Sequence, residues 1–158
     1  MDRLSRETVV RLWDEHGDAL VLYARQFCDA PEDVVQEAFL RLTQQTLVLE
    51  NPVGWLYRVV RNRALNAARG RQRQSRRESG AAARSEPWFD WAAEDRLDAA
   101  EATAALEGLP MNQREVIVAR LWGGLSFEEI ARLQGASLST VYRCYQRGLA
   151  ALRERLDG

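Results

Sequence analysis

Apolar side chains recur at intervals of three and four residues along most of this chain, and hardly any segment alternates apolar with polar residues. The first pattern is that of an amphipathic helix, whereas strict alternation would indicate a half-buried strand. Val9, Leu12 and Trp13 show the helical spacing near the start, and Leu149 and Leu152 repeat it near the end. The sequence therefore predicts an all-α protein.

Three helices are expected before residue 43. Gly17 interrupts the apolar pattern, which predicts separate helices at about residues 5–16 and 20–27. The third is expected at about residues 31–42, because proline suits a first helical position and the acids after Pro31 favour the positive end of the helix dipole. Its expected buried stripe consists of Val35, Ala38, Phe39 and Leu42.

A fourth helix is predicted after a loop, with Asn51 as its cap and Pro52 as its first residue. Gly70 is expected to weaken the end of this helix, and the apolar pattern then disappears. Two small helical domains joined by a flexible linker account for this organisation. The predicted first domain, linker and second domain are residues 1–70, 71–96 and 97–158.

The second predicted domain contains the pattern of a helix-turn-helix. An earlier helix is expected to start with Asn112 as its cap and to stop at Gly123. Ser126 and Glu129 then match a capping box, and Gly135 stands where a tight turn needs a left-handed residue. Ser137 is expected to cap a last helix, whose apolar residues are Leu138, Val141, Tyr145, Leu149, Leu152 and Leu156.

A polar face of this last helix is expected to point outward. An ordinary helical hairpin with a solvated arginine face is one interpretation. The agreement of the capping box, the turn glycine and the second cap favours the other, a helix that enters the major groove of DNA. The residues on this face are Ser139, Thr140, Tyr142, Arg143, Gln146 and Arg147.

The formal net charge of −1 conceals an uneven distribution of charge. All 22 basic residues are arginine, and eight of them lie in residues 58–77, which contain no Asp or Glu. A block of +8 over so short a stretch predicts a local site for a polyanion.

Aromatic residues precede this block on the same predicted helix. Trp55 and Tyr57 lie just upstream of Arg58 and Arg61. Arginine together with aromatic rings suits single-stranded nucleic acid, because guanidinium groups bind phosphates and rings stack on bases. Trp55 is equally compatible with a place in the core, and the arginines with a solvated surface.

Few residues are available for catalysis or metal binding. The chain has a single His and two cysteines, Cys28 and Cys144, without a Cys-x-x-Cys pair. No apolar run approaches the ~18 residues that span a bilayer, and the N-terminus lacks the pattern of a signal peptide. We therefore expect a cytoplasmic protein that is not an enzyme, with no metal, no cofactor and no membrane insertion.

Four segments in order resemble the extracytoplasmic function (ECF) sigma factors of bacterial RNA polymerase. Asp33–Leu42 and Trp55–Asn62 resemble the second conserved region of that family, whose pattern is Asp-x-x-Gln-[Glu/Asp]-x-Phe-Leu-Arg-Leu followed by Trp-Leu-Tyr-Arg-x-x-Arg-Asn. Leu109–Val116 and Gly124–Ala131 resemble the fourth region. Each motif alone is weak, whereas the ordered set covers nearly the whole chain.

The resemblance implies a promoter-specificity subunit without catalysis of its own. Its implied partners are core RNA polymerase, promoter DNA and an anti-sigma factor, and the sequence does not identify the last of these.

The same resemblance assigns roles to three sets of residues. The acidic third helix would bind the clamp helices of the largest polymerase subunit through Asp33, Gln36, Glu37, Leu40 and Arg41. The fourth helix would melt the minus-ten element and read it as single strand through Trp55, Arg58, Arg61, Asn62 and Arg63. The last helix would read the minus-thirty-five element as duplex through Ser137, Ser139, Thr140, Tyr142, Arg143, Gln146 and Arg147.

Two other interpretations remain open from the sequence. A helical repressor or activator that binds duplex DNA without polymerase needs only the second domain to function. A helical adaptor that binds proteins alone leaves the arginine block unexplained. Binding to purified core polymerase separates the sigma-factor interpretation from both.

Overall fold

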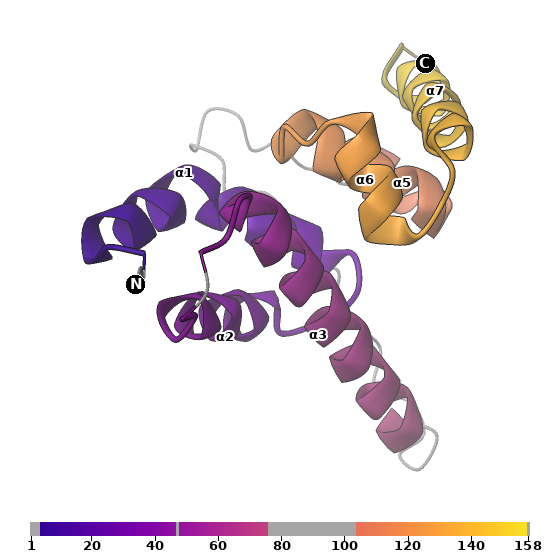
Figure 1. The fold of residues 1–158 in the computed structure, drawn as a ribbon. Helices are drawn as coiled ribbons and strands as arrows, with labels where there is room; N and C mark the ends of the chain where they lie inside the picture. The colour runs from indigo at the N-terminus through magenta and orange to yellow at the C-terminus, as the bar shows by residue number, and fades with distance from the viewer. Residues whose placement is uncertain (1–3, 47, 76–103, 158) are drawn as a thin grey trace, which may run out of the picture. The chain divides into compact units, whose positions relative to one another are not determined.

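Every regular element among residues 4–46, 48–75 and 104–157, the part of the chain that this computed structural model describes, is a helix (Figure 1). The chain divides into two units, residues 1–80 and 81–158. The prediction of an all-α protein with two helical domains is confirmed. Most of the predicted linker lies outside the described residues, and its boundaries remain a prediction.

The first unit starts with one long helix, α1 (Arg6–Arg25), so the predicted break at Gly17 is wrong. The Ser5 hydroxyl caps this helix by accepting a hydrogen bond from the Thr8 backbone N–H at 3.2 Å. A glycine inside a helix costs about 0.5–1 kcal/mol relative to alanine. That cost is too small to stop a helix whose buried face continues on both sides, through Leu12 and Leu20.

The next two helices start where the sequence predicts. Helix α2 (Pro31–Thr43) has Pro31 as its first residue, and the carboxamide oxygen of Asn51 caps α3 (Pro52–Ser75) by accepting from the Gly54 N–H at 3.1 Å. Helix α3 passes through Gly70 and ends at Ser75, so the expected weakening at that glycine is not seen. The first five residues of the predicted linker, 71–75, are therefore helical.

The core of the first unit is built around two aromatic side chains. Tyr23 and Tyr57 are fully buried, and their rings pack edge to face with centroids 5.1 Å apart. Burial raises the pKa of the Tyr57 phenol. Within the described part of the chain, the Tyr57 hydroxyl has no hydrogen-bond partner. The expectation that the Tyr57 ring is available to stack on bases is therefore wrong, because the ring fills the core.

Tyr57→Phe is expected to leave the stability of the first unit unchanged or to raise it by up to about 1 kcal/mol. The substitution keeps the ring and removes a hydroxyl whose burial without a partner is unfavourable. Thermal and denaturant unfolding of the two proteins measure the difference. A loss of more than about 1 kcal/mol would show that the hydroxyl makes a stabilising hydrogen bond.

The second unit follows with shorter helices. Residues 104–107 are helical, and this helix ends before Pro110. Helix α5 (Met111–Ile117) continues into a π-helical segment, η2 (Val118–Trp122), and α6 (Phe127–Gln134) and α7 (Leu138–Asp157) complete the unit. Among the described residues, no helix is both long and apolar enough to cross a bilayer.

The start of α5 differs from the prediction by two residues. Pro110 occupies the cap position and its carbonyl accepts from the Arg114 N–H at 3.0 Å, so Asn112 is the second helical residue and not the cap. The Pro110 φ of −56° already has a helical value, which lets the helix begin directly after it.

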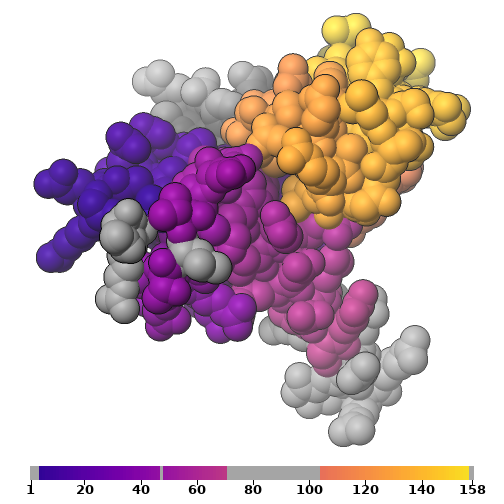
Figure 2. Space-filling model, in the orientation of Figure 1, coloured from indigo at the N-terminus to yellow at the C-terminus, as the bar shows by residue number. Residues whose placement is uncertain are grey.

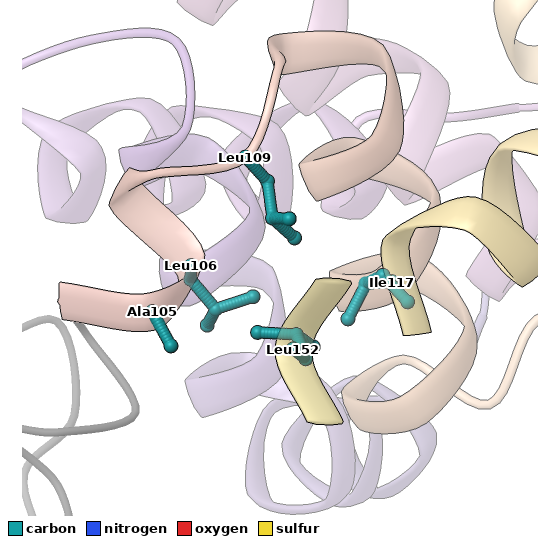
Figure 3. Close-up of a cluster of buried hydrophobic side chains, with 5 residues drawn as sticks. All are labelled: Ala105, Leu106, Leu109, Ile117 and Leu152. Atoms are coloured by element: carbon teal, nitrogen blue, oxygen red, sulfur yellow. The ribbon is translucent and has the colours of Figure 1, made fainter. Parts of the chain in front are cut away.

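Leucine and isoleucine side chains from three segments form one core cluster of this unit (Figure 3). Leu106 precedes α5, Ile117 ends it, and Leu152 comes from α7. Helices α5 and α7 approach closely at Gly148, where an added β-carbon would lie 3.1 Å from the Ile117 side chain. This packing holds the long α7 in place and leaves its opposite face free.

Candidate nucleic-acid and protein interfaces

The turn between α6 and α7 has the geometry of a helix-turn-helix. The Ser126 hydroxyl accepts from the Glu129 N–H, the Glu129 carboxylate accepts from the Ser126 N–H, and both distances are 3.1 Å. This confirms the predicted capping box. Gly135 has a φ of 65°, in the left-handed region, and Ser137 caps α7 by accepting from the Thr140 N–H at 3.2 Å.

Buried residues fix the crossing of the two helices. Ile130 and Ala131 of α6 and Val141 of α7 are buried, as the sequence predicts. The Phe127 ring packs edge to face against Tyr142, with centroids 5.4 Å apart, and so orients a tyrosine at the edge of the exposed face. The second helix is therefore held rigidly against the first.

All seven residues that the sequence assigns to the duplex-binding face are exposed. They lie on α7 and its cap, which belong to the orange-to-yellow segments on the surface in Figure 2. Arg143 and Arg147 are one helical turn apart and extend from the same side. Both are exposed, as guanidinium groups that bind base edges or phosphates must be.

Sequence reasoning missed one residue of this face. Leu138, one of the apolar residues of the last helix, is 47% exposed at the first position of α7. An apolar side chain at the start of a recognition helix can contact a thymine methyl group. Leu156, another apolar residue near the end of the helix, is also exposed. Apolar spacing alone does not indicate that these two side chains are exposed, because it does not show where the supporting helices end.

The outer face of α2 is as polar as predicted. Its inner side, including Val35 and Phe39, is buried, and this confirms the predicted stripe. Leu40 is 62% exposed among polar neighbours. The exposed residues of this face are Asp33, Gln36, Glu37, Leu40 and Arg41.

Helix α1 adds an apolar groove beside Leu40 that the sequence does not predict. Val10 is 53% exposed and Trp13 is 42% exposed. The Trp13 ring packs edge to face on Phe39, with centroids 4.8 Å apart. The groove has a volume of about 390 Å³ and is lined by Val9, Val10, Trp13, Gln36, Phe39, Leu40 and Thr43.

Helix α3 presents its predicted residues unequally. Arg58 and Asn62 are exposed, whereas Trp55 is half-buried. Arg61 is also half-buried, and its guanidinium carbon lies 5.8 Å from the centroid of the Phe27 ring. Arg63 is half-buried and forms an ion pair with Glu37 of α2. The structure therefore brings one residue of the α2 face together with one residue of the α3 face.

Comparison with known proteins finds sigma-factor regions in both units. The family model of Sigma-70 region 2 matches residues 12–74, and that of Sigma-70, region 4 matches residues 99–152. The ECF RNA polymerase sigma factor SigK of Mycobacterium ulcerans is 30% identical over 149 residues, which cover 86% of this chain and 78% of SigK.

Solved structures of sigma factors have the same fold. The sigma factor RpoE of Bartonella quintana, solved with the anti-sigma factor NepR, has a TM-score of 0.71 and 22% identity, and the match covers 97% of this chain and 98% of RpoE. CnrH, solved with the cytosolic domain of CnrY, has a TM-score of 0.63 and 26% identity over 98% of this chain and 90% of CnrH. The chain belongs to the extracytoplasmic function family of RNA polymerase sigma factors.

Proposed function

We propose that this sigma factor uses three separate surfaces to start transcription. The outer face of α2 binds core RNA polymerase, α3 binds the melted minus-ten element, and α7 reads the minus-thirty-five element as duplex. The observation that carries the proposal is the complete helix-turn-helix, whose seven assigned residues are all exposed. A polar helix face supported in this way fits the major groove.

The α2 face is suited to a protein partner because it combines an apolar groove with charged residues. Leu40 and Trp13 supply exposed apolar area, and Asp33 and Arg41 lie beside it on the polar side. Exposed apolar patches with polar rims mark interaction sites. Core polymerase binds at the α2 face, and the sigma factor acts in the cytoplasm, where the polymerase works.

The α3 face is suited to unpaired DNA. Arg58 and Asn62 are exposed one helical turn apart, and residues 58–77 contain eight arginines and no acid. Arginine binds phosphate and also stacks on bases, which lysine does less well.

RpoE was solved with the anti-sigma factor NepR. We extend that class of partner to this chain as part of the proposal.

The double substitution Arg58→Ala with Asn62→Ala tests the role in strand opening. Both residues are exposed, so stability should change by less than about 0.5 kcal/mol each. Core binding should be unchanged, whereas opening of a duplex promoter should fall, as permanganate footprinting of unpaired thymines will show. A template mismatched across the minus-ten region should recover much of the activity.

Arg11→Ala is the matched control, because it removes an exposed arginine of the same unit from α1. It should open the promoter normally. Equal losses on duplex and mismatched templates would assign Arg58 and Asn62 to general DNA affinity. Binding of promoter duplex without any affinity for core polymerase would favour a stand-alone helix-turn-helix regulator.

A further inference from the structure

We propose that the ion pair between Arg63 and Glu37 couples polymerase binding to DNA binding, an inference that rests on the proposed function. In the free sigma factor, Glu37 of α2 holds the side chain of Arg63 of α3 in the ion pair. A cationic or hydrogen-bond-donating group of the polymerase that binds Glu37 releases Arg63 to a DNA phosphate. Each partner then strengthens the binding of the other.

The two members of the pair lie on the two helices that carry the polymerase and minus-ten surfaces. An Nη1 atom of Arg63 on α3 contacts the Oε1 atom of Glu37 on α2. The Arg63 side chain is 23% exposed and that of Glu37 is 53% exposed. Glu37 is therefore open to a partner at the α2 face, while Arg63 is the member that is held back from solvent.

The ion pair leaves the Arg63 guanidinium partly unsatisfied. Its Nε atom is buried and has no hydrogen-bond partner within the described part of the chain. A buried N–H without a partner is unfavourable, so the retracted position depends on the charge of Glu37. A phosphate offers several acceptor oxygens to the same guanidinium, and its hydrogen bonds to arginine are frequently bidentate.

The charge around Arg63 favours its release. It belongs to the stretch of residues 58–77, which contains eight arginines and no acid. Like charges within a Debye length repel one another, and Glu37 supplies a neutralising charge from a different helix. Once the polymerase occupies Glu37, that charge no longer holds Arg63. Linkage requires the converse, so DNA that takes Arg63 leaves Glu37 free for the polymerase.

Glu37→Gln in the full-length protein tests the coupling. The probe is a short fluorescein-labelled single-stranded DNA of mixed sequence, and its binding is followed by anisotropy over a range of salt concentrations. Without polymerase, E37Q should bind the probe about two- to fivefold more tightly, the effect expected from releasing a solvent-accessible ion pair. The slope of log K against log salt should steepen by about 0.7, which corresponds to one more phosphate contact.

Glu32→Gln is the matched control. Glu32 lies on the same helix, its side chain is 56% exposed, and it also forms an ion pair, with Arg25 of α1 at 3.0 Å. The variant E32Q removes the same charge without releasing Arg63, so its salt slope should equal that of the wild type. In an R63Q background, E37Q should no longer steepen the slope, because the released group is missing.

A second measurement tests the reciprocal arm. In the absence of DNA, R63Q should bind purified core polymerase more tightly than the wild type, since Glu37 is then unpaired. Thermal unfolding of each variant checks that the fold is kept. Equal effects of E37Q and E32Q, or an effect of E37Q that persists in R63Q, would overturn the coupling. A wild-type protein that binds neither core polymerase nor DNA would overturn the proposed function itself.

Discussion

Leu40→Arg is expected to weaken binding to core polymerase by about 2 kcal/mol or more, roughly thirtyfold. Leu40 is 62% exposed on α2 and lies beside the apolar groove that α1 completes with Val10 and Trp13. A charge placed at the centre of such an interface loses its hydration without gaining a partner. The fold should be retained, because the Leu40 side chain is largely exposed.

Equilibrium binding of labelled variant to purified core enzyme measures this effect. Leu156→Arg is the control, because it places the same charge on another exposed leucine, 53% exposed near the end of α7. It should bind core polymerase as the wild type does. If L40R melts normally and binds core enzyme with unchanged affinity, the polymerase surface lies elsewhere on the molecule.

Arg143→Ala is expected to relax the preference at one base pair of the upstream promoter element by about 1–3 kcal/mol. Arg143 is exposed on α7 within the first two turns after the Ser137 cap, the part of a recognition helix that reaches base edges. Arg147, one turn further along, is expected to hold a phosphate. Its loss should weaken all sequences alike and make the salt dependence shallower.

Binding of both variants to a set of duplexes with single base-pair changes separates the two roles. The pattern expected for R143A is a loss of discrimination confined to one position, against an even loss at every position for R147A. A uniform loss for R143A, with no position singled out, would assign Arg143 to backbone contact.

Local sequence was enough to predict the starts of α3, α6 and α7 and the tight turn. Asn51, Ser126 and Ser137 cap the helices as predicted, and Gly135 takes the left-handed conformation that its place in the turn requires. Each of these features depends on hydrogen bonds or torsion angles within three or four residues. Such interactions are visible in a sequence because no distant segment is needed to form them.

The glycine that was expected to interrupt the first helix illustrates the opposite case. Gly17 lies inside α1, between the buried Leu12 and Leu20. A helical glycine costs about 0.5–1 kcal/mol, and burial of a single leucine side chain returns about 1.5–3 kcal/mol. Packing between helices therefore decides whether the helix continues. A local sequence pattern does not show how much free energy that packing contributes.

Apolar spacing and charge blocks by themselves determined that this chain forms two helical domains with an outward polar face on the last helix. Only the tertiary structure decided that the apolar side chains of α1 stay uncovered, as Val10 and Trp13 do beside the α1–α2 groove. It also decided that Arg63 of α3 meets Glu37 of α2, the helix on the other side of the connecting loop. Exposure and ion pairing depend on which segments the fold brings within a few ångströms of each other, and that proximity is a property of the packed chain.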